Sequence, residues 1–311
     1  MASVAVIDIG SNSIKVLVAT RAAGGGLTVL KTRTIDARIS AGISHVSPRL
    51  SEPGMAAGLA AVQSLLAEAA PFQPAATVLV ATSAVRDAQN GPEFRSRVKA
   101  ATGQTIRILT GDEEANLIGR GLTCDPALAD LQNFYVFDLG GGSLECLAFQ
   151  QRKVQHAASL QLGCVRLTEK FVPDPTQPFS NAAQTAITTH VREVFHNGTF
   201  QFVLGTAAAI GTGGTVTVAR AILAARDGHG LGDSVPAVTV VQLRHLLQWL
   251  GNMPLAARRE VPGLPAARAD VMPAALATLI AVAEVGHIAT FRHSLFNLRY
   301  GLAAEALERL R

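Results

Sequence analysis

The feature of this sequence that most constrains its fold is a short sequence pattern that occurs twice. Its best-defined copy lies near the middle of the chain. Residues 134–137 form an apolar run typical of a buried strand, followed by Asp138, a stretch of three glycines and a second apolar-rich run that begins beside Glu145. This order predicts a hairpin with a tight turn, in which glycine lets exposed backbone N–H groups approach an anion closely. Asp138 and Glu145 would lie near that turn, where carboxylates suit a divalent cation bound to phosphate.

A second copy of this pattern lies at the start of the sequence. An apolar strand, residues 4–7, is followed by Asp8, by the turn residues 9–13 and by another apolar run from Ile14. One Asp-x-Gly turn would be weak support for a phosphate loop, because such turns are common. Two copies about a domain's length apart predict a duplicated α/β fold, with a phosphate held between two related halves.

Composition limits the classes of protein that this chain can belong to. With 311 residues, of which 49% are hydrophobic and 16% charged, the chain can form two globular domains with substantial cores. The net charge of +4 permits a polyanionic substrate, and no basic cluster with interleaved aromatic residues indicates nucleic acid. The apolar runs are too short or too interrupted to span a bilayer, and three cysteines without metal-type spacing fit reduced thiols. We therefore expect a soluble cytoplasmic protein with no nucleic-acid or membrane partner.

The order of predicted elements also repeats, as three strands, a helix and a strand in each half. We expect an N-terminal domain over residues 1–124 and a C-terminal domain with extra helices over residues 125–311. The apolar helices after Val240 are candidates for a homodimer face. The elements that follow each hairpin are predicted at Leu27–Ile35, Glu52–Ala70 (capped by Ser51) and Thr77–Ala81 in the first half, and at Val154–Leu162, Ser180–His196 and Phe200–Leu204 in the second.

Two polar segments of the first half are candidates for chemistry. Arg86 lies in a loop directly after a strand, where its planar fork suits phosphate oxygens, although a pair with Asp87 or another carboxylate would explain it equally well. A helix then opens with Asp112, Glu113 and Glu114, and we expect Gly119 and Gly121 to end it. Acidic residues in a first helical turn often only complement the helix dipole, whereas one aimed into a cleft could orient and deprotonate water.

A third glycine-rich turn lies in the second half, at residues 211–215, before a helix predicted at 216–225. Such a turn at a helix N-terminus can bind an anion, but close packing of a helix on a strand selects glycine equally. Further along, Arg268 could pair with Asp270 or face the cleft.

Six segments in a fixed order resemble the exopolyphosphatase and guanosine pentaphosphate phosphatase family, in its short two-domain form. The resemblance implies the duplicated ribonuclease-H-like fold of the actin, sugar-kinase and Hsp70 superfamily, with two lobes and a central cleft. The segments are Asp8-Ile-Gly-Ser-Asn-Ser13, Ala81-Thr-Ser-Ala-Val-Arg-Asp-Ala-Gln-Asn-Gly91, Gly111-Asp-Glu-Glu-Ala115, Asp138-Leu-Gly-Gly-Gly-Ser-Leu-Glu145, Leu162-Gly-Cys-Val-Arg-Leu-Thr-Glu169 and Gly211-Thr-Gly-Gly-Thr215.

The resemblance also implies roles for residues of this chain. Glu114 would be the general base on water, Arg86 a phosphate contact, and Asp138 with Glu145 would position Mg²⁺, or another divalent cation, and the attacked phosphoryl group. Glu145 counts both as a catalytic residue and as a metal ligand. The phosphate-binding residues would be Asp8, Gly10, Ser11, Asn12, Ser13, Gly140, Gly141, Gly142, Ser143, Gly213, Gly214 and Thr215.

The expected activity is hydrolysis of a terminal phosphoanhydride bond, in inorganic polyphosphate or in guanosine pentaphosphate (pppGpp). Two alternatives stay open at this point. One is an ATP-dependent kinase or ATPase of the same superfamily, since the same loops would hold ATP. The other is a non-catalytic regulator that binds pppGpp or polyphosphate.

Overall fold

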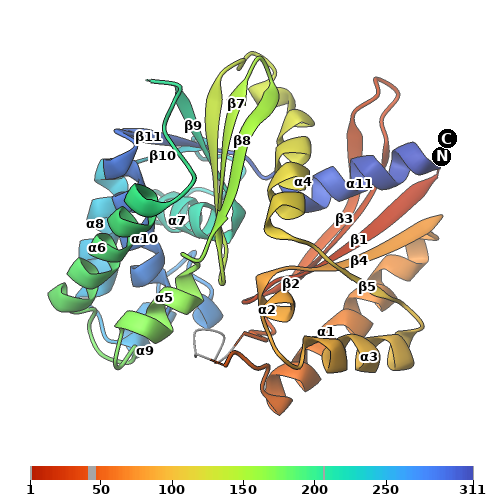
Figure 1. Cartoon of the computed structure of the whole chain (residues 1–311), viewed down its shortest axis with the longest axis horizontal. Helices are drawn as coiled ribbons and strands as arrows, with labels where there is room; N and C mark the ends of the chain where they lie inside the picture. The colour runs from red at the N-terminus through yellow and green to blue at the C-terminus, as the bar shows by residue number, and fades with distance from the viewer. Residues whose placement is uncertain (1, 41–46, 206, 311) are drawn as a thin grey trace. The chain divides into compact units, whose positions relative to one another are not determined.

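The structure is a computed structural model that describes residues 2–40, 47–205 and 207–310 (Figure 1). The chain forms two compact units, Met1–Asp130 with Phe296–Arg311, and Leu131–Leu295. The boundary therefore falls a few residues after the one expected at 124/125. Residues 296–311 belong to the first unit, not to the C-terminal domain in which the sequence placed them, because the last helix packs there.

The first unit is built on a five-stranded sheet with the order β3-β2-β1-β4-β5. The first three strands form antiparallel hairpins, and β4 and β5 run parallel to β1. This order and these directions are those of a ribonuclease-H-type sheet. The strands are β1 (Ser3–Ile9), β2 (Ile14–Arg21), β3 (Leu27–Ile35), β4 (Ala76–Ala81) and β5 (Ile106–Ile108).

Helices cover both faces of this sheet (Figure 1). The predicted cap of α1 is confirmed, because the Ser51 hydroxyl accepts from the Gly54 N–H. With the turn that follows it, α1 is long and apolar enough to pass a composition test for a membrane span, but Met55, Val62 and Leu65 pack into the core of the unit. The helices and 3₁₀ turns are α1 (Glu52–Ala69), η1 (Ala70–Phe72), α2 (Ser83–Arg86), α3 (Gly91–Thr102), α4 (Gly111–Thr123), η2 (Pro126–Leu128) and α11 (Leu298–Arg309).

The second unit repeats the arrangement. Its six-stranded sheet has the order β10-β11-β9-β6-β7-β8, so the strands from β8 to β11 reproduce the pattern of the first sheet and β10 is an added edge strand. The predicted duplication is thus confirmed at the level of strand order and direction. The strands are β6 (Phe134–Leu139), β7 (Leu144–Gln150), β8 (Lys153–Leu160), β9 (Ala208–Thr212), β10 (Ala237–Thr239) and β11 (Thr290–His293).

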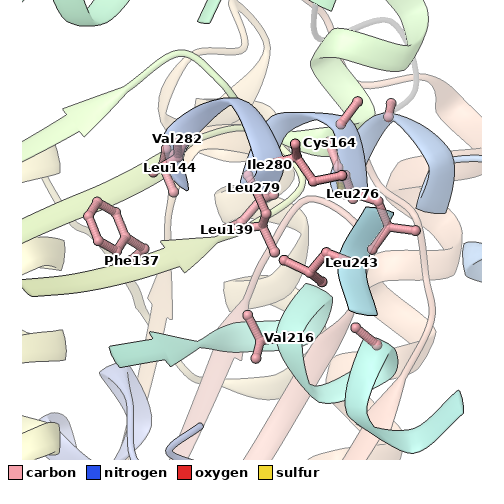
Figure 2. Close-up of a cluster of buried hydrophobic side chains, with 14 of the residues drawn as sticks. Phe137, Leu139, Leu144, Cys164, Val216, Leu243, Leu276, Leu279, Ile280 and Val282 are labelled. Carbon is pink, nitrogen blue, oxygen red and sulfur yellow. The ribbon is translucent and has the colours of Figure 1, made fainter. Parts of the chain in front are cut away.

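A large apolar core lies between one face of this sheet and the helices of the unit. Figure 2 shows Leu139 and Leu144 of the hairpin gathered with Val216 of α7 and Leu279 of α10. Alternate residues of the same strands, Asp138 and Glu145, point to the opposite face because strand side chains have a period of two. The helices and the 3₁₀ turn are α5 (Cys164–Phe171), α6 (Asn181–Asn197), α7 (Gly213–Arg226), α8 (Val240–Gly251), α9 (Leu255–Arg259), η3 (Ala266–Arg268) and α10 (Met272–Val285).

The prediction of a strand at Phe200–Leu204 is wrong. The fourth strand of the second sheet is β9, a few residues later, and it ends directly before Gly213. Phe200 and Phe202 instead pack edge to face with Tyr135, so the apolar residues that suggested a strand fill the core as an aromatic cluster.

The helix that carries Glu114 continues past the two glycines that were expected to end it. A Cβ at Gly121 would overlap the backbone of Asn297, and one at Gly301 would overlap the Leu117 carbonyl group. These glycines therefore let α4 and α11 approach closely, which explains why glycine occurs inside a helix here.

Candidate active site

The two predicted hairpin turns have the same geometry. In the first, the Gly10 N–H donates to the Ser13 carbonyl at 3.2 Å, and Asp8 lies opposite Lys15 in the strand register. In the second, the Gly140 N–H donates to the Ser143 carbonyl at 3.0 Å. There Asp138 lies opposite Glu145, so the second hairpin carries two facing carboxylates.

The orientation of the second turn is set by α5. The N–H of Cys164 donates to the Gly140 carbonyl and that of Val165 to the Gly141 carbonyl, both at 2.9 Å, and Arg166 Nε donates to the Gly142 carbonyl at 2.8 Å. In a trans peptide the C=O and the N–H point in opposite directions. The N–H groups that follow these three carbonyls, those of residues 141–143, therefore point away from α5 in a row suited to an anion.

The first turn is held in a similar way by the segment after β3. Ser40 donates its N–H to the Ser11 carbonyl at 3.2 Å, and Arg38 donates its N–H to the Asn12 carbonyl at 2.9 Å. The N–H groups of Asn12 and Ser13 consequently point away from that segment. The Asn12 amide is buried, and within the described part of the chain neither of its polar atoms has a hydrogen-bond partner. A buried unpaired amide is costly, and a bound phosphate or water would satisfy it.

Asp138 and Glu145 belong to a polar row that crosses four neighbouring strands. Asp138 is aligned with Thr212 of β9 on one side and with Glu145 on the other, and Glu145 is aligned with Ser159 of β8. Glu145 is only 2% exposed, and its Oε1 accepts from the Ser159 hydroxyl at 2.8 Å. Two carboxylates with hard oxygen atoms fit a cation such as Mg²⁺, which keeps several waters and takes few protein ligands.

The third glycine-rich turn joins β9 to α7 and lies against this row. Gly213 has φ +81°, and a Cβ there would lie 3.0 Å from Cγ of Asp138 and nearer still to its Oδ1. A Cβ at Gly214 would meet the Arg268 guanidinium carbon at 2.8 Å, and Thr215 donates its hydroxyl to the Leu139 carbonyl at 3.2 Å. The left-handed backbone and the close approach of Asp138 therefore account for Gly213, whereas the Arg268 side chain that lies over Gly214 is long and could move. The turn brings the start of α7, the Asp138 carboxylate and the Arg268 guanidinium together.

Arg86 and Glu114 meet in the first unit, 28 residues apart in sequence. Arg86 Nη1 donates to Glu114 Oε2 at 3.1 Å and to the Leu109 carbonyl at 2.9 Å, and its Nε donates to Asp87 Oδ1 at 3.3 Å. Glu114 is 6% exposed. Of the interpretations left open for Arg86, the carboxylate pair is the one seen here. Its partner is the predicted base, whose carboxylate Arg86 therefore orients.

The neighbouring Glu113 has a purely structural role. Its carboxylate accepts from the Thr110 N–H at 2.8 Å, and the Thr110 hydroxyl accepts from the Glu113 N–H, which completes a capping box. Arg107 also pairs with Glu113 at 2.8 Å. The Thr110 N–H and, to a lesser extent, Arg107 lower the pKa of Glu113. Glu113 thus stabilises the start of α4 through hydrogen bonds, and the two adjacent glutamates have separate environments.

Sequence reasoning missed several partners of these residues. Ser159 was taken as part of a plain strand, because its alignment with Glu145 depends on the β7–β8 register. Arg166 was noted only as part of a motif, and the position of Arg268 over Gly214 arises from a turn more than fifty residues after that glycine. No periodicity in the sequence signals either contact.

Two ribonuclease-H-type sheets, each with an Asp-bearing turn whose backbone N–H groups are suited to an anion, define an actin-like fold. The chain belongs to the Ppx/GppA phosphatase family, whose family model matches residues 17–310. The motif resemblance in the sequence is thereby confirmed.

Individual relatives agree with this assignment. The chain is 29% identical to a guanosine-5'-triphosphate,3'-diphosphate pyrophosphatase of Photobacterium profundum over 99% of its own length, and it spans 60% of the length of that relative. A crystal structure of an exopolyphosphatase-like protein is similar over 99% of this chain and 98% of the other, with 26% identity and a TM-score of 0.89. An exopolyphosphatase from Cytophaga hutchinsonii shares the fold, with 19% identity, 99% coverage of both chains and a TM-score of 0.86.

Proposed function

We propose that this protein is a phosphoric anhydride hydrolase that releases orthophosphate from the end of inorganic polyphosphate, or converts pppGpp to ppGpp. The observation that carries hydrolysis is the buried Glu114 carboxylate, held by Arg86 at the start of α4. A carboxylate in a fixed orientation can position a water molecule and accept its proton. A kinase has no need of such a base for water, and a binding protein has no need of a base at all.

The proposal assigns roles to residues of both units. The N–H groups of Asn12 and Ser13, and those of residues 141–143, bind phosphate oxygens and neutralise their charge. Glu114 accepts the proton of the attacking water. Arg86 keeps the Glu114 carboxylate in one orientation, and its contact with phosphate, implied by the resemblance, stays a prediction.

Asp138 and Glu145 would hold the divalent cation, with the Ser159 hydroxyl fixing Glu145. When bound, the cation would offset negative charge that develops on the transferred phosphoryl group. Both carboxylates lie on rigid strands, so their spacing is set by the hairpin register and not by loop motion. We also propose a cytoplasmic location, for which the three cysteines, present as thiols and not as disulfides among the described residues, are the support.

The substitution Glu114→Gln tests the base. It keeps the size of the side chain and an acceptor for Arg86, but removes the group that takes the proton, so we expect normal folding and a loss of phosphate release of at least about a hundredfold. Glu113→Gln is the matched control, since glutamine also serves in a capping box and the residue is adjacent, with a side chain that is 42% exposed. Phosphate release with Mg²⁺ is measured in parallel from polyphosphates of graded length, pppGpp and ATP.

The outcomes separate the candidate functions. Release at the parent rate by the folded Glu114→Gln protein would show that the base is assigned wrongly. Consumption of ATP with transfer to a small metabolite would favour a kinase. Saturable binding of pppGpp without hydrolysis under any divalent metal would favour a regulator.

A further inference from the structure

A chain of hydrogen-bonded polar side chains, two buried and two half-buried, lies in the second unit outside the residues assigned above. Arg220 of α7 is 7% exposed, and its Nη2 donates to the carbonyls of Leu231 and Ser234 at 2.6 Å each. Its Nε lies 3.0 Å from the Ser234 hydroxyl, and its Nη1 lies 3.0 Å from Nδ1 of His293 on β11. Arg220 thus joins the loop before β10 to a buried histidine.

This chain of hydrogen bonds continues from His293 to the third glycine-rich turn. Nε2 of His293 lies 3.0 Å from the hydroxyl of Thr217, and that hydroxyl donates to the Gly213 carbonyl at 2.7 Å. Gly213 is the first residue of α7 and the residue against which the Asp138 carboxylate packs. One continuous set of hydrogen bonds therefore runs from a surface loop to the turn beside the proposed metal carboxylates.

The direction of each hydrogen bond in this chain is fixed. A guanidinium can only donate, so Nδ1 of His293 must accept, and a neutral ring then carries its proton on Nε2. That proton is donated to Thr217, which leaves the threonine hydroxyl able to donate to Gly213. Burial and, to a lesser extent, the Arg220 charge lower the pKa of His293 to about 4, so the ring is neutral at pH 7.

Position 293 is one where the strand pattern favours an apolar residue. His293 shares a face of β11 with Phe291, which is part of the main core of the unit, and both are buried. Burying histidine and arginine is unfavourable unless their polar atoms are bonded, and an aliphatic residue would fill the same space without that cost. The hydrogen-bonded polar residues therefore have an effect other than filling the core. Because they end at the Gly213 carbonyl, we expect that effect in the third glycine-rich turn.

We propose that His293, together with Arg220 and Thr217, is a positioning residue of the site, and that its fixed tautomer orients the Gly213–Gly214 peptide. Because that peptide is trans, holding the Gly213 carbonyl towards Thr217 points the Gly214 N–H the opposite way, as an anion donor at the start of α7. The same constraint keeps the turn in place against Asp138. This inference rests on the proposed phosphatase function for its effect on catalysis.

The variants Thr217→Val and Thr217→Ser test the proposal as a pair. Valine keeps the branched shape and removes the hydroxyl, whereas serine keeps the hydroxyl. Losing one hydrogen bond of average strength corresponds to a change of about fivefold, so we expect Thr217→Val to raise the KM for the best substrate by about that factor, with a smaller change in kcat. Thr217→Ser should retain the parent KM. Thermal melting confirms that both variants are folded at the assay temperature.

Nuclear magnetic resonance gives a readout that does not depend on activity. In protein labelled with ¹⁵N-histidine and ¹⁵N-glycine, we expect the Nε2–H tautomer of His293 at pH 7 and a Gly214 amide signal that shifts in Thr217→Val but not in Thr217→Ser. A charged ring, an Nδ1–H tautomer, or an unshifted Gly214 signal would overturn the positioning role. So would parent kinetics in a folded Thr217→Val protein.

A failure of the positioning inference can be distinguished from a failure of the proposed function. If the parent protein releases phosphate but Thr217→Val behaves like the parent, the positioning inference alone is overturned. If the parent releases no phosphate from any of the substrates tested, the proposed function is overturned and the catalytic role of the polar chain with it.

Discussion

Replacing Gly213 by alanine is the sharpest single test of how the third glycine-rich turn is built. An L-residue at φ +81° adopts a left-handed conformation that costs about 1–2 kcal/mol. The new Cβ would also lie 3.0 Å from Cγ of Asp138 and nearer to its Oδ1, and overpacking of this kind costs about 1–3 kcal/mol. We therefore expect Gly213→Ala to lower the free energy of unfolding of the second unit by about 2–5 kcal/mol and to displace the Asp138 carboxylate.

Gly228→Ala is the matched control. Gly228 follows α7 at φ +76°, but a Cβ there would have no atom within 4 Å, so only the backbone term of about 1–2 kcal/mol applies. The protein has a single tryptophan, Trp249, which lies in the same unit and is 42% exposed, so its fluorescence reports the unfolding of this unit in urea.

Activity completes the comparison. Gly213→Ala should need a higher Mg²⁺ concentration for half-maximal phosphate release and should turn over more slowly, because one of the two proposed metal carboxylates has moved. Gly228→Ala should keep the parent Mg²⁺ requirement. Equal stability of the two variants, together with parent activity in Gly213→Ala, would refute the packing argument for this turn.

Further predictions concern the pH dependence of stability and the α4–α11 contact. The unfolded His293 ring takes up a proton near pH 6.5 and the folded one only near pH 4, so its contribution to stability is complete at pH 7 and is lost as the pH falls through this window, by up to about 3 kcal/mol. Urea unfolding at pH 7, 5.5 and 4 should show this loss in the parent and a smaller one in His293→Gln; parallel curves would contradict it. Gly301→Ala should destabilise the first unit by about 1–3 kcal/mol in thermal melts, because its Cβ would overlap the Leu117 carbonyl group, whereas Gly24→Ala, whose Cβ meets open space, should change little. A parent-like melt of Gly301→Ala would exclude close backbone approach as the reason for glycine there.

Local sequence patterns predicted those parts of the fold that depend on neighbouring residues. Apolar runs on either side of Asp8 and Asp138 predicted both hairpins, and Ser51 and Ser180 predicted helix starts, all of which the structure confirms. The same reasoning failed at Phe200–Leu204 and at Gly121. There, aromatic clustering and the approach of a distant helix outweigh local strand and helix preferences.

The features of the candidate site also fall into two groups, those that the sequence predicted and those that only the structure showed. The sequence alone determined which residues carry the carboxylates and the glycine turns, and that Asp138 and Glu145 lie near one hairpin turn, because a hairpin with a short turn depends on neighbouring residues. The strand register of the structure then showed that Asp138 faces Glu145. Only the tertiary structure decided that Arg86 orients Glu114, that Asp138 packs on Gly213, and that the last helix returns to the first unit. Each of these contacts joins residues 28 or more positions apart, and which distant residues meet depends on how whole helices and sheets pack, which no short pattern records.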